Sequence, residues 1–159
     1  MTELRVGIGL DAHALVGGVP LVLGGISIEY PKGLAGHSDG DVIAHALIDA
    51  LLGAANLGDI GSLFPSGDEQ YRGASSLDLL WEAYREVRDA GYELVNADCV
   101  LVGEEPRIGD VRDEMCERLA AALGVAPGQV TVRATTTDGL GFTGRGEGLA
   151  AQAVALLRR

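Results

Sequence analysis

The sequence predicts an α+β fold, in which a single mixed β-sheet carries helices packed mainly on one face. Three observations predict it: segments that alternate with period two, segments with apolar residues three or four apart, and a chain order that mixes the two kinds. The order is strand, strand, helix, helix, strand, helix, strand, helix. Such a mixture favours one sheet covered by helices. Because most of these helices could lie on one face, we expect an α+β sandwich rather than a doubly wound fold.

The first third of the chain predicts two strands followed by a helix. Residues 4–10 alternate enough to form a strand, and residues 19–28 form a second strand that a Gly-Gly pair interrupts. Residues 41–57 have the apolar stripe of a helix. Ser38 is expected to cap this helix, and Asp41, three residues later, completes a start that resembles a capping box.

The remainder of the chain predicts three more helices and two more strands. We expect helices at residues 75–89, 108–123 and 146–157, the last because it is rich in Ala and Leu. Strands are expected at residues 94–102 and 129–135, where apolar and β-branched residues are frequent. Helices on one face leave the other face of the sheet exposed unless another subunit covers it, so an oligomer is expected.

Length and composition exclude several classes of protein. The chain has 159 residues, and we expect a single domain over residues 1–159. No apolar run is long enough to cross a bilayer and the N-terminus lacks the order of a signal peptide, so a cytoplasmic protein without a membrane partner is expected. The net charge of −11 and the scarcity of aromatic residues argue against a nucleic-acid partner.

Asp11, His13 and His45 form the strongest candidate metal site. Residues two apart on an extended segment point to the same side, so Asp11 and His13 can reach one point, and His45 lies on the first expected helix. One carboxylate and two imidazoles with an open fourth position suit a catalytic zinc ion. Asp41 or Asp49 could accept the other ring N–H of His45 and fix its tautomer, although Asp41 could instead only cap the helix. The alternative from spacing alone is three unrelated polar residues.

Three loops could bind phosphates or hydroxyl groups. The turn at residues 36–40 precedes a helix and could receive a phosphate oxygen on its N–H groups, or could be an ordinary capped turn. The Gly-rich loop at residues 56–61 carries Asp59, which could accept hydrogen bonds from sugar hydroxyls, or could be a helix C-cap. Residues 133–138 contain an Arg, three Thr and an Asp, which suit phosphate and Mg²⁺, although β-propensity alone also explains the Thr run.

Together these segments resemble the 2-C-methyl-D-erythritol 2,4-cyclodiphosphate synthase family of the non-mevalonate isoprenoid pathway. The similarity runs essentially end to end, and its motifs are long and occur in the family's order. They are RVGIGLDAH at residues 5–13, LAGHSDGDV at 34–42 followed by His45, ALLGAANLGDIG at 50–61 and ATTTDGLGFTGRGEG at 134–148.

The resemblance implies a fold, an assembly and a reaction. The fold is related to ferredoxin-like folds, and the assembly is a homotrimer with active sites between neighbouring subunits. The substrate is 4-diphosphocytidyl-2-C-methyl-D-erythritol 2-phosphate, whose 2-phosphate attacks the β-phosphorus so that CMP leaves and the cyclic diphosphate forms. In-line phosphoryl transfer of this kind needs positioning and charge neutralisation more than covalent participation by the protein.

The resemblance also implies ligands for two metals. Asp11, His13 and His45 hold Zn²⁺ or another divalent ion, with a substrate β-phosphate oxygen as the fourth ligand, so that Asp11 and His13 also belong to the substrate site. Mg²⁺ or Mn²⁺ binds the substrate diphosphate, with Asp138 as its protein ligand. The family often has Glu at that position, one methylene longer, so the metal is expected closer to the chain or held through water.

Substrate contacts follow from the same resemblance. His37, Asp59 and Thr136 are the catalytic candidates, with Thr136 on the diphosphate. His37 and Ser38 hold the 2-phosphate and erythritol region, and Asp59 and Gly61 hold erythritol hydroxyls. The cytidine side is formed by the segment 103–108, which includes Gly103, Pro106 and Ile108, together with Arg133, and Ala134 and Thr135 also bind the substrate. Arg133 replaces a Lys that is common there, which changes the donor geometry.

Phe142 and Arg145 are implied to line the trimer axis, where an isoprenoid diphosphate can bind; the alternative is a loop packed at the interface. Two other functions compete with the synthase. One is a binding module that recognises a cytidine nucleotide without turning it over. The other is a zinc hydrolase that uses metal-bound water and Asp59 or Asp49 as general base.

Overall fold

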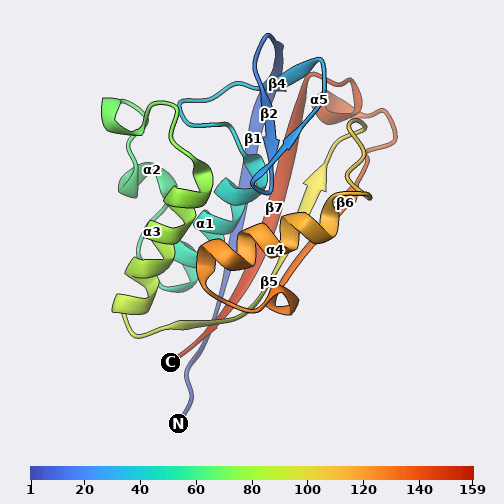
Figure 1. Cartoon of the computed structure of the whole chain (residues 1–159). Coiled ribbons are helices and arrows are strands. Elements are labelled where there is room, and N and C mark those ends of the chain that lie inside the picture. Colours follow the sequence, from blue (N-terminus) through green and yellow to red (C-terminus); the bar gives the residue numbers. More distant parts are fainter.

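The computed structural model describes all 159 residues. Its strands are β1 (Leu4–Gly17), β2 (Leu21–Leu23), β3 (Ile26–Ile28), β4 (Lys32–Leu34), β5 (Glu93–Val102), β6 (Val130–Thr135) and β7 (Gly148–Arg158). Its helices are α1 (Val42–Ala54), α2 (Ile60–Leu63), α3 (Ser76–Asp89), α4 (Arg112–Leu123) and α5 (Gly141–Gly144), with 3₁₀ turns η1 (Glu69–Tyr71) and η2 (Pro127–Gln129). Figure 1 shows their arrangement.

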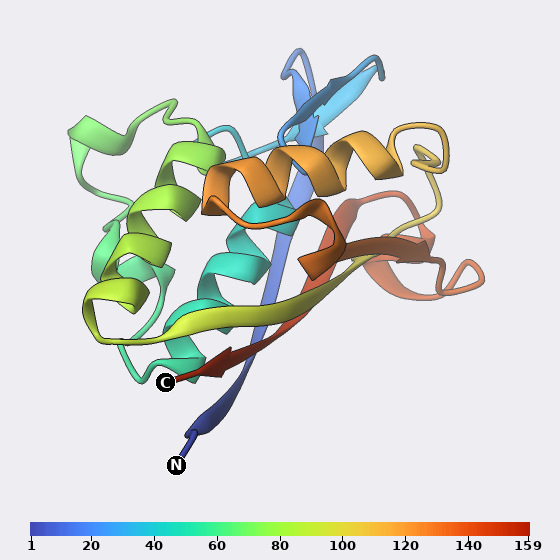
Figure 2. The same cartoon turned by 60° about the horizontal axis from the view of Figure 1, so that its bottom comes forward.

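A five-stranded sheet with the order β4-β1-β7-β5-β6 forms the centre of the molecule. Its neighbours are antiparallel except β5 and β6, which are parallel, so the sheet is mixed as predicted. The long helices lie on one side of it, with α1 against β1 and β7 and α4 against β6 (Figures 1 and 2). Helix α3 packs on α1 and α4 and forms an outer layer. The predicted α+β class is therefore confirmed.

Two glycines of β1 allow α1 to pack closely on the sheet. A Cβ added to Gly7 would lie 2.0 Å from the Ala50 carbonyl oxygen, and one added to Gly9 would lie 1.9 Å from the Ala46 carbonyl oxygen. Both distances are shorter than any non-bonded contact, so the backbone of α1 can approach only where β1 has no side chain. This contact brings the start of α1 beside Asp11 and His13.

The opposite face of β1 and β7 is not covered by any element of the chain. The apolar residues on this side are exposed to solvent, with exposed fractions of 62% for Leu4, 69% for Val6, 62% for Ile8, 69% for Leu10 and 42% for Val154. We call these five residues the open sheet face. Contiguous exposed apolar residues on this scale mark an interaction surface.

The helix predicted at residues 146–157 is wrong, because this segment is strand β7 in the middle of the sheet. Its high Ala content suggested a helix, but its burial alternates with period two from Ala151 onward. Ala151, Ala153, Ala155 and Leu157 are buried, whereas Gln152 and Val154 point away from the core. Small side chains are needed on the buried side because α1 lies directly against β7.

Several boundaries also differ from the prediction. Residues 19–28 form the hairpin β2–β3, because Gly24 and Gly25 turn the chain with φ of 58° and 76°. The first strand continues to Gly17, and α4 begins at Arg112 rather than at residue 108. None of the helices has the length and apolar character that a bilayer crossing needs.

Candidate metal centre and adjoining cavities

Strand β1 and helix α1 bring Asp11, His13 and His45 together. Asp11 and His13 are two residues apart on β1 and both point to the helix side, as the spacing predicted, while His45 lies in the first turn of α1. Asp11 Oδ2 lies 2.8 Å from His13 Nε2 and 3.1 Å from His45 Nδ1, and the two ring nitrogens are 3.3 Å apart. Three potential ligand atoms therefore form a small triangle at the edge of the core.

The triangle has the size that a tetrahedral zinc ion requires. Ligands at 2.0–2.1 Å from zinc lie roughly 3.3 Å from one another in a tetrahedron. The observed separations of 2.8, 3.1 and 3.3 Å approach this value, and one carboxylate with two imidazoles is a donor set that zinc accepts. The residues present thus fit a divalent metal with one position left for another ligand.

Mutual hydrogen bonds perturb the acid–base behaviour of this cluster. Burial alone would raise the pKa of Asp11, but hydrogen bonds to His13 and His45 outweigh it and lower the pKa to about 2. The hydrogen bond to Asp11 raises the pKa of His13 more than burial lowers it. Asp11 is therefore a carboxylate over the whole physiological range, and a metal must displace a proton from His13 at the lower end of that range.

The second ring nitrogen of His45 is held by hydroxyl groups, not by a carboxylate. Nε2 lies 2.8 Å from the Ser76 Oγ and 3.0 Å from the Ser38 Oγ. The expected contact with Asp41 or Asp49 is wrong, since Asp49 instead accepts a hydrogen bond from the Ile60 N–H over 2.7 Å. Ser76 went unrecognised as a site residue because it reaches His45 only through the packing of α3 on α1.

Asp41 stabilises the start of α1 and the neighbouring turn through hydrogen bonds to backbone N–H groups. Its carboxylate accepts from the N–H groups of Gly24, Gly25 and Ala44 at 3.0, 2.7 and 3.1 Å. It is the N-cap of α1, so the prediction that Ser38 caps this helix is wrong. Complete burial raises the pKa of Asp41 to about 6, against the pull of these N–H donors.

The turn at residues 36–40 pairs only part of its N–H groups within the chain. Asp39 N–H donates to the Ala74 carbonyl oxygen over 3.1 Å, Gly40 N–H to Ser38 Oγ over 3.4 Å, and Asp41 N–H to Asp39 Oδ1 over 3.0 Å. These donors fix the turn itself. The N–H groups of Gly36, His37 and Ser38 make no such hydrogen bond, so a phosphate held by this part of the turn stays a prediction.

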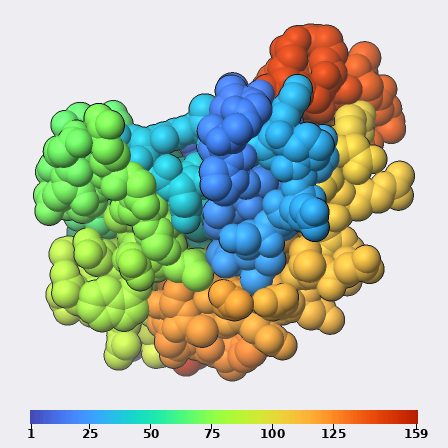
Figure 3. Space-filling view, turned by 45° about the horizontal axis from the view of Figure 1, so that its top comes forward, coloured from blue at the N-terminus to red at the C-terminus, as the bar shows by residue number.

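A cavity of about 190 Å³ opens beside the metal ligands, and we call it the metal-side cavity. Seen in Figure 3, the surface is hollowed between the green segment after α1 and the blue strands, with the cyan segment that leads into α1 between them. The residues that line the cavity are Asp11, His13, His37, Ser38, His45, Ile60, Gly61, Phe64, Ser66, Tyr71 and Leu79.

The metal-side cavity is lined by several of the predicted residues and also by apolar side chains that were not predicted. His37, whose Nε2 lies 2.9 Å from the Asp68 carbonyl oxygen, Ser38 and Gly61 all line it as expected. Phe64 and Tyr71, which pack edge to face at 5.2 Å, were not identified because aromatic residues are common in any core. The predicted catalytic residue Asp59 is not among the lining residues.

Asp59 caps helix α2 and directly precedes Ile60 and Gly61, which line the metal-side cavity. Its carboxylate accepts from the Ser62 N–H over 2.8 Å, and this hydrogen bond lowers the pKa of Asp59. The side chain is exposed, so it remains an ionised acceptor. The capping role that the sequence left open and a contact with substrate hydroxyls are compatible.

A second cavity, of about 540 Å³, lies where β5 and β6 end, and we call it the Thr136 cavity. Six predicted residues line it: Gly103, Pro106, Ile108, Ala134, Thr135 and Thr136. Arg107, which lies within the predicted segment 103–108, also lines it, and so does Arg112, which was missed. The sequence carried a signal for Arg112, because Arg107 and Arg112 place two guanidinium groups within six residues in a chain with net charge −11.

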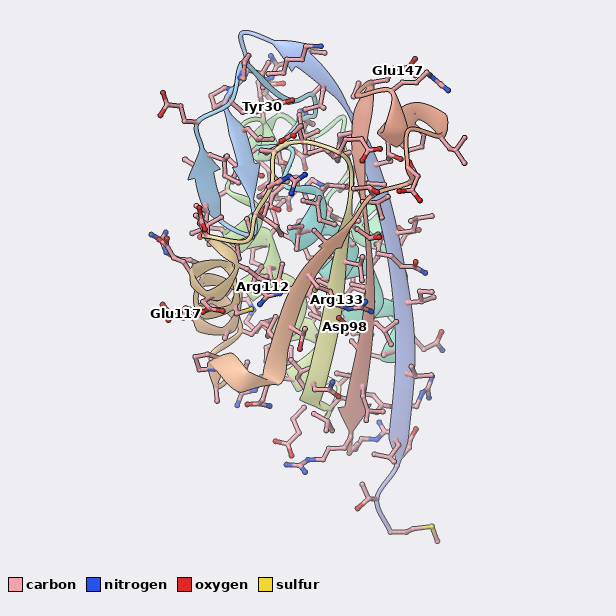
Figure 4. The ribbon with its side chains drawn as sticks, turned by 90° about the vertical axis from the view of Figure 1, so that its right-hand side faces the viewer. Tyr30, Asp98, Arg112, Glu117, Arg133 and Glu147 are labelled. Atoms are coloured by element: carbon pink, nitrogen blue, oxygen red, sulfur yellow. The ribbon has the colours of Figure 1, made fainter.

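Arg133 does not line the Thr136 cavity of its own chain, so its predicted place on the cytidine side stays a prediction. Residues of β6 alternate, so Arg133 points to the side of the sheet away from α4, as Val130 and Val132 point into the core. Its guanidinium forms a two-pronged ion pair with Asp98 of β5 at 3.1 and 3.0 Å (Figure 4). The signal that mattered was the strand period, which separates position 133 from position 134.

The Gly-rich loop after β6 holds the remaining predicted residues. Asp138 has a positive φ of 52°, and its carboxylate accepts from the Thr136 hydroxyl over 3.3 Å, so the two predicted diphosphate-side residues do meet. Phe142 is 43% exposed on α5, and the Arg145 guanidinium pairs with Glu147 at 2.9 Å. Figure 4 places Glu147 at the end of the molecule above β7.

Comparisons with known proteins agree with the site. A model of the YgbB family matches residues 4–158. Curated relatives called 2-C-methyl-D-erythritol 2,4-cyclodiphosphate synthase include one from Moorella thermoacetica, 61% identical over 97% of this chain and 94% of its own. Another, from Rubrobacter xylanophilus, is 57% identical over 100% of this chain and 98% of its own.

Solved structures show the same fold. A 2C-methyl-D-erythritol-2,4-cyclodiphosphate synthase in a form bound to CDP has a TM-score of 0.87 and 40% identity, covering 96% of this chain and 99% of that one. The bifunctional IspDF from Campylobacter jejuni has a TM-score of 0.96 and 42% identity over 99% of this chain. This chain spans 43% of the length of that bifunctional protein.

Proposed function

The chain belongs to the YgbB family of 2-C-methyl-D-erythritol 2,4-cyclodiphosphate synthases, and we propose that it converts 4-diphosphocytidyl-2-C-methyl-D-erythritol 2-phosphate into the cyclic diphosphate with release of CMP. The observation that carries this proposal is the triangle of Asp11, His13 and His45 on the wall of the metal-side cavity. It supplies the positive charge, through a divalent ion, that an acidic protein needs for a highly anionic substrate.

The reaction is an intramolecular phosphoryl transfer. An oxygen of the substrate's own 2-phosphate forms a bond to the β-phosphorus, the bond from that phosphorus to the oxygen shared with the α-phosphate breaks, and CMP leaves with that oxygen. A zinc ion at the triangle would neutralise charge on the β-phosphate, and Mg²⁺ or Mn²⁺ would do so on the diphosphate beside Asp138. No activated Ser or Cys nucleophile is required.

The protein's part is to hold the two ends of the substrate. His37 and Ser38 would orient the 2-phosphate and erythritol portion in the metal-side cavity, and Asp59 with Gly61 would accept and donate to erythritol hydroxyls. Thr136 would contact the diphosphate. The Thr136 cavity would take the cytidine end, and the guanidinium groups of Arg107 and Arg112 would add local positive charge there.

The two cavities support a site shared between subunits. They have no lining residue in common within one chain, although the substrate would have to reach both. The open sheet face is apolar and uncovered. A homotrimer that buries this face and sets the metal-side cavity of one subunit against the Thr136 cavity of its neighbour would account for both observations. Phe142 and Arg145 would then line the axis and bind an isoprenoid diphosphate; loss of that binding in an Arg145→Ala trimer is the test.

The deciding experiment follows the phosphorus atoms of the substrate by NMR in the presence of zinc and Mg²⁺. The parent should give cyclic diphosphate and CMP, and His45→Ala should give neither, because one of three ligands is missing. A linear product would instead establish a zinc hydrolase. Bound nucleotide without turnover would establish a binding module.

A further inference from the structure

The role of His45 depends on which of its ring nitrogens carries the proton. Its Nδ1 lies 3.1 Å from Asp11 Oδ2 and 3.3 Å from His13 Nε2, so Nδ1 is the atom that faces the metal position. A neutral imidazole that binds a metal through one nitrogen carries its proton on the other. Nε2 must therefore donate a hydrogen bond, and its partner must be oriented to accept one.

Asp39 orients the partner. The Ser76 hydroxyl, 2.8 Å from His45 Nε2, also contacts Asp39 Oδ1 as a donor. A carboxylate has no proton to give, so the single proton of this hydroxyl points at Asp39 and its lone pairs face Nε2. Ser76 is completely buried, so its hydroxyl depends on buried partners such as Asp39 and His45.

Backbone groups hold the Asp39 carboxylate in place. Ser76 N–H donates to Asp39 Oδ2 over 3.0 Å, and Asp41 N–H donates to Asp39 Oδ1 over 3.0 Å. The carboxylate also sits at the N-terminus of α3, where the helix dipole favours negative charge. Its position is thus determined by both α3 and the turn before α1.

We propose that, when a metal is bound, Asp39 and Ser76 are positioning residues that hold His45 as the tautomer with the proton on Nε2, so that the lone pair of Nδ1 faces the metal instead of a proton facing Asp11. The proposal rests on the proposed function only in taking Asp11, His13 and His45 as metal ligands. Asp39 acts through Ser76, and Ser76 acts through His45.

Ser38 has a different part in this arrangement. Its hydroxyl lies 3.0 Å from the same Nε2, but Nε2 has one proton and the Ser76 hydroxyl is nearer at 2.8 Å. The Ser38 Oγ also lies 3.4 Å from the Ser76 Oγ, which can accept the Ser38 proton, and the Ser38 side chain lines the metal-side cavity. This division explains why two serines meet one imidazole nitrogen.

Two substitutions test the proposal through zinc affinity, measured by competition with a chelator. Ser76→Ala removes the acceptor, and outer-shell changes of this kind lower metal affinity about 10-fold to 100-fold. In Asp39→Asn, the amide NH₂ of the new side chain can donate to the Ser76 hydroxyl. That hydroxyl would then donate its own proton to His45 Nε2, and the ring proton of His45 would remain on Nδ1. We expect a loss at least as large. Ser75→Ala is the matched control, because Ser75 is the N-cap of α3 yet makes no side-chain hydrogen bond there.

A spectroscopic measurement separates tautomer control from general damage. In the zinc-loaded parent, the His45 Nε2–H should appear in ¹H–¹⁵N imidazole spectra as a proton protected from exchange. In Ser76→Ala this proton should exchange rapidly, while the melting curve of the metal-free protein shows that the fold is kept.

The outcomes are distinct. Parental zinc affinity together with a protected Nε2–H in Ser76→Ala would overturn the proposal and leave the proposed function intact. A parent that binds no zinc would overturn both. Weaker zinc binding in both variants, alongside a parent that fails to form the cyclic diphosphate, would support the positioning role and reject the proposed reaction.

Discussion

The hydrogen bond between Asp11 and His13 determines how the metal-free site responds to pH. The pKa of Asp11 is lowered to about 2, so its stabilising contribution is complete above the unfolded value near 3.8 and is lost as the pH falls toward 2. The pKa of His13 is raised, so its contribution is complete below about 6.5 and is lost as the pH rises through the raised value. The pair therefore stabilises the metal-free protein most between roughly pH 4 and pH 6.5.

Zinc affinity should rise with pH, whereas the contribution of His13 to the stability of the metal-free protein falls. Metal binding needs a neutral His13, so below the raised pKa of His13 each bound ion displaces a proton. We expect the apparent zinc affinity to fall about tenfold for each unit by which the pH is lowered in that range, and to be constant at higher pH. Chelator competition between pH 6 and pH 8, with proton release measured in weak buffer, checks this. An affinity that does not change with pH would contradict it.

Arginines near the Thr136 cavity should differ in their effect on substrate binding. Arg107 and Arg112 line that cavity, whereas Arg133 is paired with Asp98 on the other side of the sheet. Arg112→Ala should raise the KM about tenfold with a smaller effect on kcat, because a charged hydrogen bond contributes roughly 1.5–3 kcal/mol. Arg133→Ala is the matched control, with an expected change in KM below about twofold because surface ion pairs contribute little. Equal effects of the two substitutions on the KM would indicate that Arg133 also binds the cytidine end of the substrate.

Local spacing predicted the residues whose relation is local. Asp11 and His13 share a side because they are two apart on a strand, and Thr136 and Asp138 meet within one loop. Ser76 could not be found in this way, since it reaches His45 only after α3 has packed on α1, and no periodicity encodes that contact. The separation of Arg133 from the Thr136 cavity of its own chain is of another kind, because the strand period that separates it from Ala134 was present in the sequence.

At the scale of elements, β7 shows how tertiary packing overrides propensity. Alanine favours helices in isolation, yet β7 is the central strand because its buried positions must be small where α1 crosses the sheet. The alternation of Gln152 and Val154 with buried alanines was visible in the sequence, but its apolar content equally suits a helix. The β2–β3 hairpin was half predicted, because its two glycines were seen as an interruption rather than as a turn.

The same close contact predicts a large effect for a single methyl group. In Gly9→Ala the new Cβ would lie 1.9 Å from the Ala46 carbonyl oxygen, so β1 and α1 must separate. We expect a loss of about 3 kcal/mol of stability, and weaker zinc binding because His45 moves away from Asp11. Gly17→Ala in the same strand is the control, since its Cβ would meet no atom within 4 Å. Unfolding at fixed protein concentration checks both, and a Gly9→Ala protein as stable as the control would show that the two elements can separate without cost.

For the whole molecule, the open sheet face and the separation of the two cavities both favour an assembly of several subunits. The helices cover only one side of the sheet, so the apolar residues of β1 and β7 on the other side gain from association. The substrate contains a cytidine and an erythritol phosphate joined by a diphosphate, whereas one chain offers its two cavities without a shared wall. Assembly would therefore complete the site as well as bury the face.

A charge placed in the open sheet face should separate these roles from folding. Ile8 is 62% exposed at the middle of this face, so Ile8→Glu adds no strain within one chain but buries an unpaired carboxylate in any interface. We expect a monomer by light scattering, zinc bound at near-parental affinity, and cyclic diphosphate formation reduced by at least about 100-fold, which corresponds to the ~3 kcal/mol that an unpaired buried charge costs. Trp81→Glu, on the outer helix α3 and 52% exposed, should change none of these measurements. A monomer with parental activity would show that one chain holds the complete site, and an Ile8→Glu trimer would show that another surface makes the assembly.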